Sequence, residues 1–199
     1  MKIKIIIILM LLSASTLMKA QTFEPKHEIS LATGGLNNSE VLDLVTSAST
    51  AIGTLGYATY DNEKFRAPIE LEYFYHVTPL IGVGGVLTYL TSKRDLMYHD
   101  EKEGEMKTTY FSVLPAVKFN WLRKQNWGLY SKIALGATFG KDKMEWTTAG
   151  HDDYDENKLW FNFQASLIGA EIGSTMFRGF VELGMGEQGI VVAGARVRF

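Results

Sequence analysis

Charged side chains recur at alternate positions inside otherwise apolar segments of this chain. Glu70 and Glu72, for example, alternate with Ile69, Leu71 and Tyr73. Because successive residues of an extended strand face opposite sides, these charges would share one face of their strands. The predicted set has five cations and four anions: Arg66, Lys118, Lys132, Arg196, Arg198, Glu28, Glu70, Glu72 and Glu182. Charges enclosed in a narrow space pair with one another, since an unpaired buried charge is costly.

The alternation that carries these charges predicts eight strands. It is clearest at residues 65–75, 109–121 and 129–139, and weaker at 29–33, 81–89, 161–167 and 181–185. The last strand, from Gly189 to Phe199, has apolar odd positions opposite Arg196 and Arg198. The alternation slips at Ile168-Gly169, which indicates a β-bulge.

The predicted connections alternate between long and short. Long polar segments cover residues 35–63, 93–107 and 140–157, whereas tight turns occur near Thr78, 123–126 and 174–176. This pattern favours an all-β, antiparallel up-and-down barrel of eight strands. Its outward aromatic residues would form two girdles, Trp121, Trp127, Tyr73, Tyr75 and Phe199 at one end and Tyr89, Phe111, Phe139, Phe161 and Phe65 at the other.

The last strand has a glycine at Gly194, an apolar residue at Val197 and an aromatic residue at Phe199. This end of the chain resembles the C-terminal signal of small outer-membrane β-barrel proteins of Gram-negative bacteria, although Val192 stands where that family usually has a polar residue. The resemblance implies a transmembrane barrel, a terminal aromatic residue that the barrel-assembly machinery reads, and contact with outer-membrane lipid, including lipopolysaccharide. The main alternative fold is a soluble eight-stranded barrel of the lipocalin type, in which the apolar face would line the interior. The aromatic residues at both strand ends and the alternating loop lengths favour the transmembrane barrel.

The N-terminus has the features of a secretory signal peptide. A short basic start is followed by the apolar run 5–12 and by small and polar residues up to Ala20, so we expect cleavage there and a barrel from 21 to 199. No later segment is long and apolar enough for a transmembrane helix. The chain has no cysteine, which excludes disulfides and thiolate metal sites. Cleavage after Ala20 would remove three lysines and no acid, so the net charge would go from 20 − 22 = −2 to 17 − 22 = −5, which argues against nucleic acid as a partner.

Four histidines raise the alternative of a lipid-modifying enzyme at the outer rim of the barrel. His27 and His76 fall near the turn end, while His99 and His151 lie beside Asp100 and beside Asp152 and Asp153. A histidine beside an acid can act as a general base, but no positioned nucleophile accompanies these residues. We therefore expect no catalytic residue and no cofactor.

Two of the long loops carry further features. Residues 150–157 are dense in carboxylates but lack the spacing of an EF-hand, so a weak divalent-ion contact is the alternative to a hydrated loop. Residues 39–52 place Val41, Leu44, Val45, Ala48 and Ile52 on one helical stripe, with Asn38 or Ser39 as the cap. An amphipathic helix over the barrel mouth and an irregular surface loop both fit this segment.

The sequence thus predicts a monomeric barrel whose lumen is closed by ion pairs. An eight-stranded barrel is only wide enough for side chains to fill, whereas diffusive pores have more strands. We expect a structural or adhesive role through the extracellular loops, with a small-solute channel or a lipid-modifying enzyme as the alternatives.

Overall fold

The protein is described here by a computed structural model, which covers residues 25–35, 37–39, 58–65, 67–98, 101–146 and 154–199. Its described elements are mainly strands. They are β1 (His27–Gly35), β2 (Ala58–Phe65), β3 (Ile69–His76), β4 (Ile81–Tyr98), β5 (Glu101–Arg123), β6 (Trp127–Trp146), β7 (Tyr154–Gly173), β8 (Phe177–Gly186) and β9 (Val191–Arg198).

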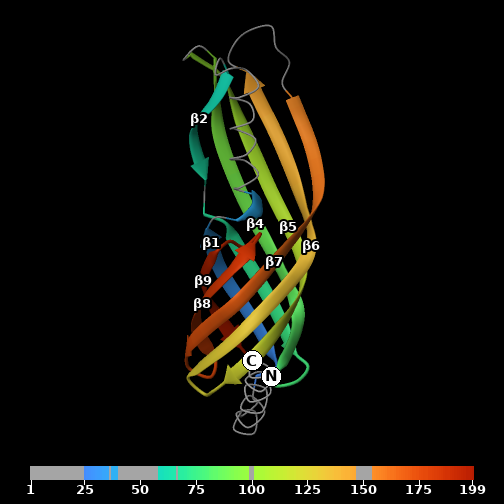
Figure 1. The fold of residues 1–199 in the computed structure, drawn as a ribbon, viewed down its shortest axis with the longest axis vertical. Helices are drawn as coiled ribbons and strands as arrows, with labels where there is room; N and C mark the ends of the chain where they lie inside the picture. The colour runs from blue at the N-terminus through green and yellow to red at the C-terminus, as the bar shows by residue number, and fades with distance from the viewer. Residues whose placement is uncertain (1–24, 36, 40–57, 66, 99–100, 147–153) are drawn as a thin grey trace, which may run out of the picture.

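Eight of these strands close into a ring (Figure 1). The neighbours around the ring are β1, β3, β4, β5, β6, β7, β8 and β9, and β9 pairs again with β1, all antiparallel. At the closing seam Glu28 is the partner of Arg198 and Gly35 is the partner of Val191. The ring is therefore the predicted up-and-down meander, with each strand beside its neighbours in sequence.

The ninth strand, β2, is not a separate member of the ring. It pairs with the same edge of β4 as β3 does, farther from the turns. Phe65 of β2 pairs with Ser92 of β4, and Ile69 of β3 pairs with Tyr89. The two strands are separated near Pro68, which has no backbone N–H to donate to the ladder. The single strand predicted over 65–75 is thus divided at its proline.

The two faces of the ring meet different surroundings. Outward positions are exposed and apolar on strand after strand, as at Ile69, Leu71 and Tyr73 of β3, while Glu70 and Glu72 between them are fully buried inside the ring. A closed barrel with an apolar exterior and a charged interior is the arrangement of a transmembrane β-barrel, and the interior is too polar for the lipocalin alternative. No helix within the described ranges is long and apolar enough to cross a membrane.

The walls of the barrel differ in height. β4, β5, β6 and β7 have 18, 23, 20 and 20 residues, whereas β1, β3, β8 and β9 have only 8 to 10. The long strands and β2 continue beyond the ring at the end opposite the C-terminus (Figure 1). We call this extension the projecting sheet: β2 together with residues 91–98, 101–109, 140–146 and 154–160.

The projecting sheet corrects three sequence predictions. Residues 35–63, 93–107 and 140–157 were expected to be long loops. However, β2 already begins at Ala58, and strands occupy the other two segments except at 99–100 and 147–153, which lie outside the described residues. These segments are polar because water can reach the outer face of the sheet here, so they lack the apolar face by which a membrane strand is found in a sequence. Paired backbone and cross-strand contacts keep them extended, such as the bond between Lys93 Nζ and Glu105 Oε1 at 2.6 Å.

The opposite end has the tight turns that the sequence predicts. They connect β3 to β4, β5 to β6 and β7 to β8 at residues 77–80, 124–126 and 174–176. Phe199 is exposed at this end, where its backbone pairs with His27 and its ring stacks on the imidazole at a centroid distance of 5.4 Å. At the other end of the belt Tyr89, Phe111 and Phe139 are exposed in one cross-strand row, as expected of an aromatic girdle.

Candidate functional site: the charged lumen

The middle of the lumen is organised around Lys132, which β6 points inward. Its ammonium group binds Glu72 of β3 and lies 2.8 Å from Glu182 Oε2 of β8. All three side chains are fully buried. The carboxylate of Glu182 also accepts a hydrogen bond at Oε1 from the Tyr130 hydroxyl at 2.7 Å and one at Oε2 from the Ser166 hydroxyl at 2.5 Å. The carboxylate of β8 is thus satisfied by groups from two other strands, β6 and β7, and Lys132 links it to Glu72 on the opposite wall of the barrel.

Arg196 connects this centre to the turn end of the lumen. Its guanidinium donates to Tyr130 Oη at 2.8 Å and to Glu171 Oε2 at 2.7 Å, and it lies 3.3 Å from Glu28 Oε1. The same group stacks on Phe180, with its carbon 3.8 Å from the ring centroid. A planar guanidinium can combine ion pairs at its edge with a ring at its face, which an ammonium group cannot do equally well.

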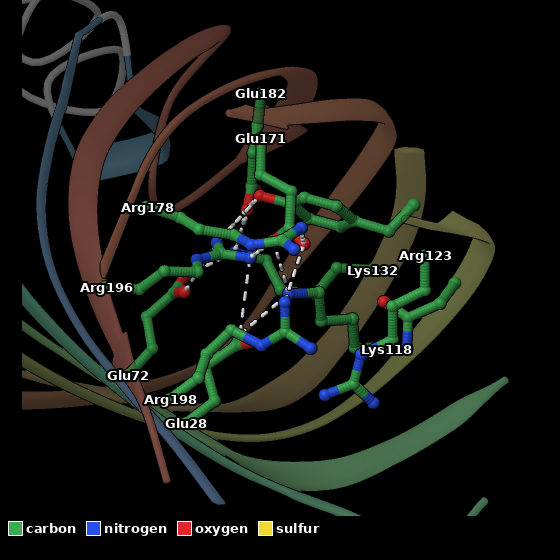
Figure 2. A network of polar contacts seen from close by, with 12 residues as sticks. Glu28, Glu72, Lys118, Arg123, Lys132, Glu171, Arg178, Glu182, Arg196 and Arg198 are labelled. Carbon is green, nitrogen blue, oxygen red and sulfur yellow. Dashed lines mark hydrogen bonds and ion pairs between the residues drawn. The ribbon is translucent and has the colours of Figure 1, made fainter. Parts of the chain in front are cut away.

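Nearer the turns, acids and bases from several strands meet inside the barrel (Figure 2). Lys118 Nζ lies 2.7 Å from Glu28 Oε1 and 3.7 Å from Glu171 Oε2. Arg178 binds Glu171 at 2.6 Å and also donates to the carbonyl oxygens of Lys124 and Gln125, so it ties the β5–β6 turn to β8.

Two further arginines close the turn end of the lumen. Arg123 donates to the Pro25 carbonyl oxygen at 2.6 Å, and Arg198 Nη1 lies 3.7 Å from Glu171 Oε1. Both side chains are buried, so the ionic network extends to the last residues of the barrel wall.

The other end of the lumen is filled by the β8–β9 connection. Glu187 and Gln188 are buried inside the ring rather than exposed on a loop. Gly186 and Gly189 flank them with φ values of +131° and +114°, which favour glycine, and this allows the chain to turn inward. The alternation of apolar and charged residues gave no sign that this connection turns inward.

Glu187 is held mainly by neutral donors. Its oxygens accept bonds from Ser39 at 2.9 Å, Ser112 at 2.6 Å and Asn162 at 2.7 Å, which come from the segment after β1, from β5 and from β7. The neighbouring Gln188 donates to Glu70 at 2.7 Å and to Glu72 at 2.9 Å. The β8–β9 connection therefore links the far wall of the barrel to the central ion pairs and fills the upper lumen.

The buried charges balance. In the part of the chain that the structure describes, the buried acids number seven (Glu28, Glu70, Glu72, Asp142, Glu171, Glu182 and Glu187) and the buried lysines and arginines also number seven (Arg94, Lys118, Arg123, Lys132, Arg178, Arg196 and Arg198). A set with no net charge, in which most members form an ion pair, avoids much of the cost of a buried net charge.

The structure brings together most of the charged residues singled out in the sequence. Glu28, Glu72, Lys118, Lys132, Glu182, Arg196 and Arg198 join one network, while Glu70 lies beside it through Gln188. Arg66 lies outside the described residues. Gly194 and Val197 of the predicted assembly signal lie in β9, and Phe199 directly follows that strand.

Sequence reasoning missed Glu171, Arg178 and Arg123, and the first two had a signal in the sequence. The register shift between Ser166 and Ile168 is the predicted bulge, and carrying the reversed parity beyond it places Glu171 inside. Arg178 lies four residues before Glu182, so it faces the same side once the predicted strand is extended back to the turn. Arg123 is inward because the register also shifts between Asn120 and Leu122, which no sequence pattern marked.

The two histidines within the described residues both lie at the turn end of the barrel. His76 is buried at the turn end, where its ring lies 3.3 Å from Glu28 and from Asn120, and His27 contacts Tyr73. His99, Asp100, His151, Asp152 and Asp153 lie outside the described residues, as do residues 40–52 of the predicted helix and most of the carboxylate-rich loop. Within the described ranges no group of three or more histidines and acids could hold a metal ion.

The closed ring, the apolar exterior and the ion-paired interior define the class of this protein: it is an eight-stranded transmembrane β-barrel. No family model matches the chain, and no curated protein matches it. Among solved structures it is similar to Ail, the attachment invasion locus protein of Yersinia pestis. One Ail structure, a complex with the heparin analogue sucrose octasulfate, has 16% identity and a TM-score of 0.49 over 87% of this chain and 99% of the other. A second has 18% identity and a TM-score of 0.48 over 89% and 100%.

Proposed function

We propose that this protein is an outer-membrane interaction protein, in which a sealed barrel anchors a projecting sheet that makes structural or adhesive contacts outside the cell. The observation that carries the proposal is the projecting sheet itself. β5 continues for ten residues from Phe111 of the aromatic row to Glu101, which corresponds to about 33 Å at the usual rise per residue. A barrel that only had to span a bilayer would not need this length.

The sealed lumen supports an anchoring role over a small-solute channel. Lys132 bridges two walls through Glu72 and Glu182, and Glu187 and Gln188 occupy the space beyond it. A solute would have to break several buried ion pairs to pass, and breaking one such pair costs several kcal/mol. The lipid-modifying enzyme has less support, since both described histidines lie at the turn end rather than at the rim of the projecting sheet.

The proposal includes the route by which the chain reaches its membrane. Residues 1–20 would act as a cleaved signal peptide, and Gly194, Val197 and Phe199 would be read by the barrel-assembly machinery. Phe199 is exposed next to β1, so a partner that recognises the end of the chain can reach it. We infer that the barrel works as a monomer surrounded by outer-membrane lipid.

A shaved barrel tests the proposed role. Residues 93–107 and 141–157 are replaced by Asn-Gly turns, which join Ser92 to its register partner Thr108 and Gly140 to its register partner Lys158. This variant should reach the outer membrane at the normal level, and its gel mobility should still change on boiling. Cells that carry it should lose the surface attachment that the full-length protein confers.

Two results would contradict the proposal. One is undiminished attachment of cells with the shaved barrel, and the other is stable single-channel conductance of the full-length protein in planar bilayers. A mass change in lipid A on expression of the protein would favour the enzyme instead.

A further inference from the structure

Three lysines lie in one row across the outer face of the projecting sheet. Lys107 of β5 has Lys93 of β4 as its register partner on one side and Lys143 of β6 on the other. All three side chains are exposed. Adjacent strands are about 4.8 Å apart, and like charges directly opposite each other destabilise an antiparallel pair.

The carboxylates near this row bind lysines other than Lys107 and Lys143. Glu105 binds Lys93 at 2.6 Å and lies 3.6 Å from Lys102, which also binds Asp95 at 2.5 Å. The hydrogen bond from Lys93 lowers the pKa of Glu105, as expected for a carboxylate held in its charged form.

The same holds on the β7 side of the row. Asp155 is the register partner of Lys143, but its carboxylate lies 3.0 Å from Lys141. Among the described residues, therefore, no ion pair joins Lys107 or Lys143 to an acid, although the two lysines face each other.

The row of lysines lies at a fixed distance from the exposed aromatic row of the barrel. Lys107 and Lys143 are each four residues from Phe111 and Phe139, which are register partners in the exposed aromatic row. Four residues correspond to about 13 Å along a strand. Residues an even number apart share a face, so these lysines point to the lipid-facing side. Aromatic girdles mark the boundary of the hydrocarbon, which puts the lysines among the headgroups of the outer leaflet.

We propose that Lys107 and Lys143 form a binding site for the phosphate groups of an anionic outer-leaflet glycolipid, lipopolysaccharide. The site rests on the proposed placement in the outer membrane and names one of the partners there. Two ammonium groups on adjacent strands can both donate to one phosphate, whose charge then removes the repulsion between them. The apolar side chains below the lysines would contact the acyl chains of the same lipid molecule, for which Phe111 and Phe139 lie exposed.

The test measures binding of purified lipid A to the full-length protein in zwitterionic detergent. The variant is Lys107→Gln/Lys143→Gln, and the matched control is Lys102→Gln/Lys141→Gln, which removes the same charge from two lysines that already bind carboxylates. Each lysine near a charged headgroup contributes about five-fold to the affinity. The first variant should therefore bind lipid A about 25-fold more weakly than the natural protein, and the control should bind it less than about three-fold more weakly. Each single variant, Lys107→Gln or Lys143→Gln, should show about a five-fold loss.

A stability measurement separates this site from a simple folding defect. Without lipid A the Lys107→Gln/Lys143→Gln variant should be as stable as the natural protein or more so, because repulsion is removed. With lipid A the natural protein should gain more stability than the variant. Equal affinity of the variant and the natural protein, equal losses in variant and control, or undiminished binding of dephosphorylated lipid A would each overturn the site. Binding of a soluble sulfated polysaccharide with the same dependence on the two lysines, in preference to lipid A, would also overturn it.

This experiment uses purified protein, so its failure is distinct from failure of the adhesive role. One possible result is that cells with the shaved barrel retain attachment, while the full-length protein binds lipid A through Lys107 and Lys143. The lipid site would then stand and the interaction role would fall. If attachment depended on the projecting sheet and lipid A did not bind, the reverse would hold.

Discussion

The lumen and the outer face of the projecting sheet contain the same kinds of ion pair in opposite surroundings. Lys132 lies between Glu72 and Glu182 with no exposed surface, whereas Lys93 reaches Glu105 at a similar distance with 47% of its side chain exposed. In the lumen the opposite charges balance and touch across strands. On the sheet the pairing is incomplete, and Lys107 faces Lys143.

The difference shows that burial, more than geometry, decides the worth of an ion pair here. Water screens an exposed pair and readily solvates either partner once the other is removed. A buried partner has no such replacement and keeps the full cost of its unpaired charge. The lumen must therefore be complete for the barrel to be stable, while the sheet can leave charges available for a ligand.

The largest expected effect is at the centre of the lumen. Glu182→Ala removes the acceptor of Tyr130 and Ser166 and one of the two carboxylates that bind Lys132, and it should destabilise the barrel by about 3–5 kcal/mol in urea titrations of the refolded protein. The matched control, Glu145→Ala on the exposed face of the sheet, should change the free energy of unfolding by less than about 0.5 kcal/mol. Equal urea midpoints for the two variants would show that the lumen does not depend on its charges.

A smaller effect is expected where the lumen network is made of neutral donors. Glu187→Ala leaves Ser39, Ser112 and Asn162 without their shared acceptor and should cost about 1–3 kcal/mol. Glu187→Gln should cost less, because the amide oxygen still accepts. Both variants should stay closed in bilayer conductance measurements, since the ion pairs of Lys132 remain. An open channel in either variant would mean that the β8–β9 connection alone seals the barrel.

The smallest effect belongs to the exposed pair of the sheet. Glu105→Gln should change stability by less than about 1 kcal/mol, and high salt should remove the change. The lowered pKa of Glu105 means that the pair stabilises above the pKa of the unfolded chain and is lost as the pH falls through the folded value. A loss of stability on raising the pH through this range, absent in Glu105→Gln, would contradict the assignment. The comparison is best made by thermal unfolding at several pH values.

The sequence alone determined the strands of the membrane belt and the side of the barrel that each faces. A strand with lipid on one side and charged groups on the other repeats every two residues, which is a local pattern. The ladder is also interrupted near a local signal, Pro68, and shifts register at the bulge near Ile168. Because this two-residue repeat is local, it also identified the charges that point inward, and seven of the nine belong to one network.

Only the tertiary structure decided the rest. Residues 93–107 and 140–157 read as loops because the polar faces of their strands show no apolar repeat, and pairing between distant segments reveals them as strands. No local pattern marks Glu187 and Gln188 as buried, yet they lie inside the ring, where they bind partners on β3, β5 and β7. The repulsion between Lys107 and Lys143, 36 positions apart in the sequence, likewise exists only through the register of β5 and β6. Alternation along one strand is a property of neighbouring residues, whereas the partner of each charge depends on how the ring closes.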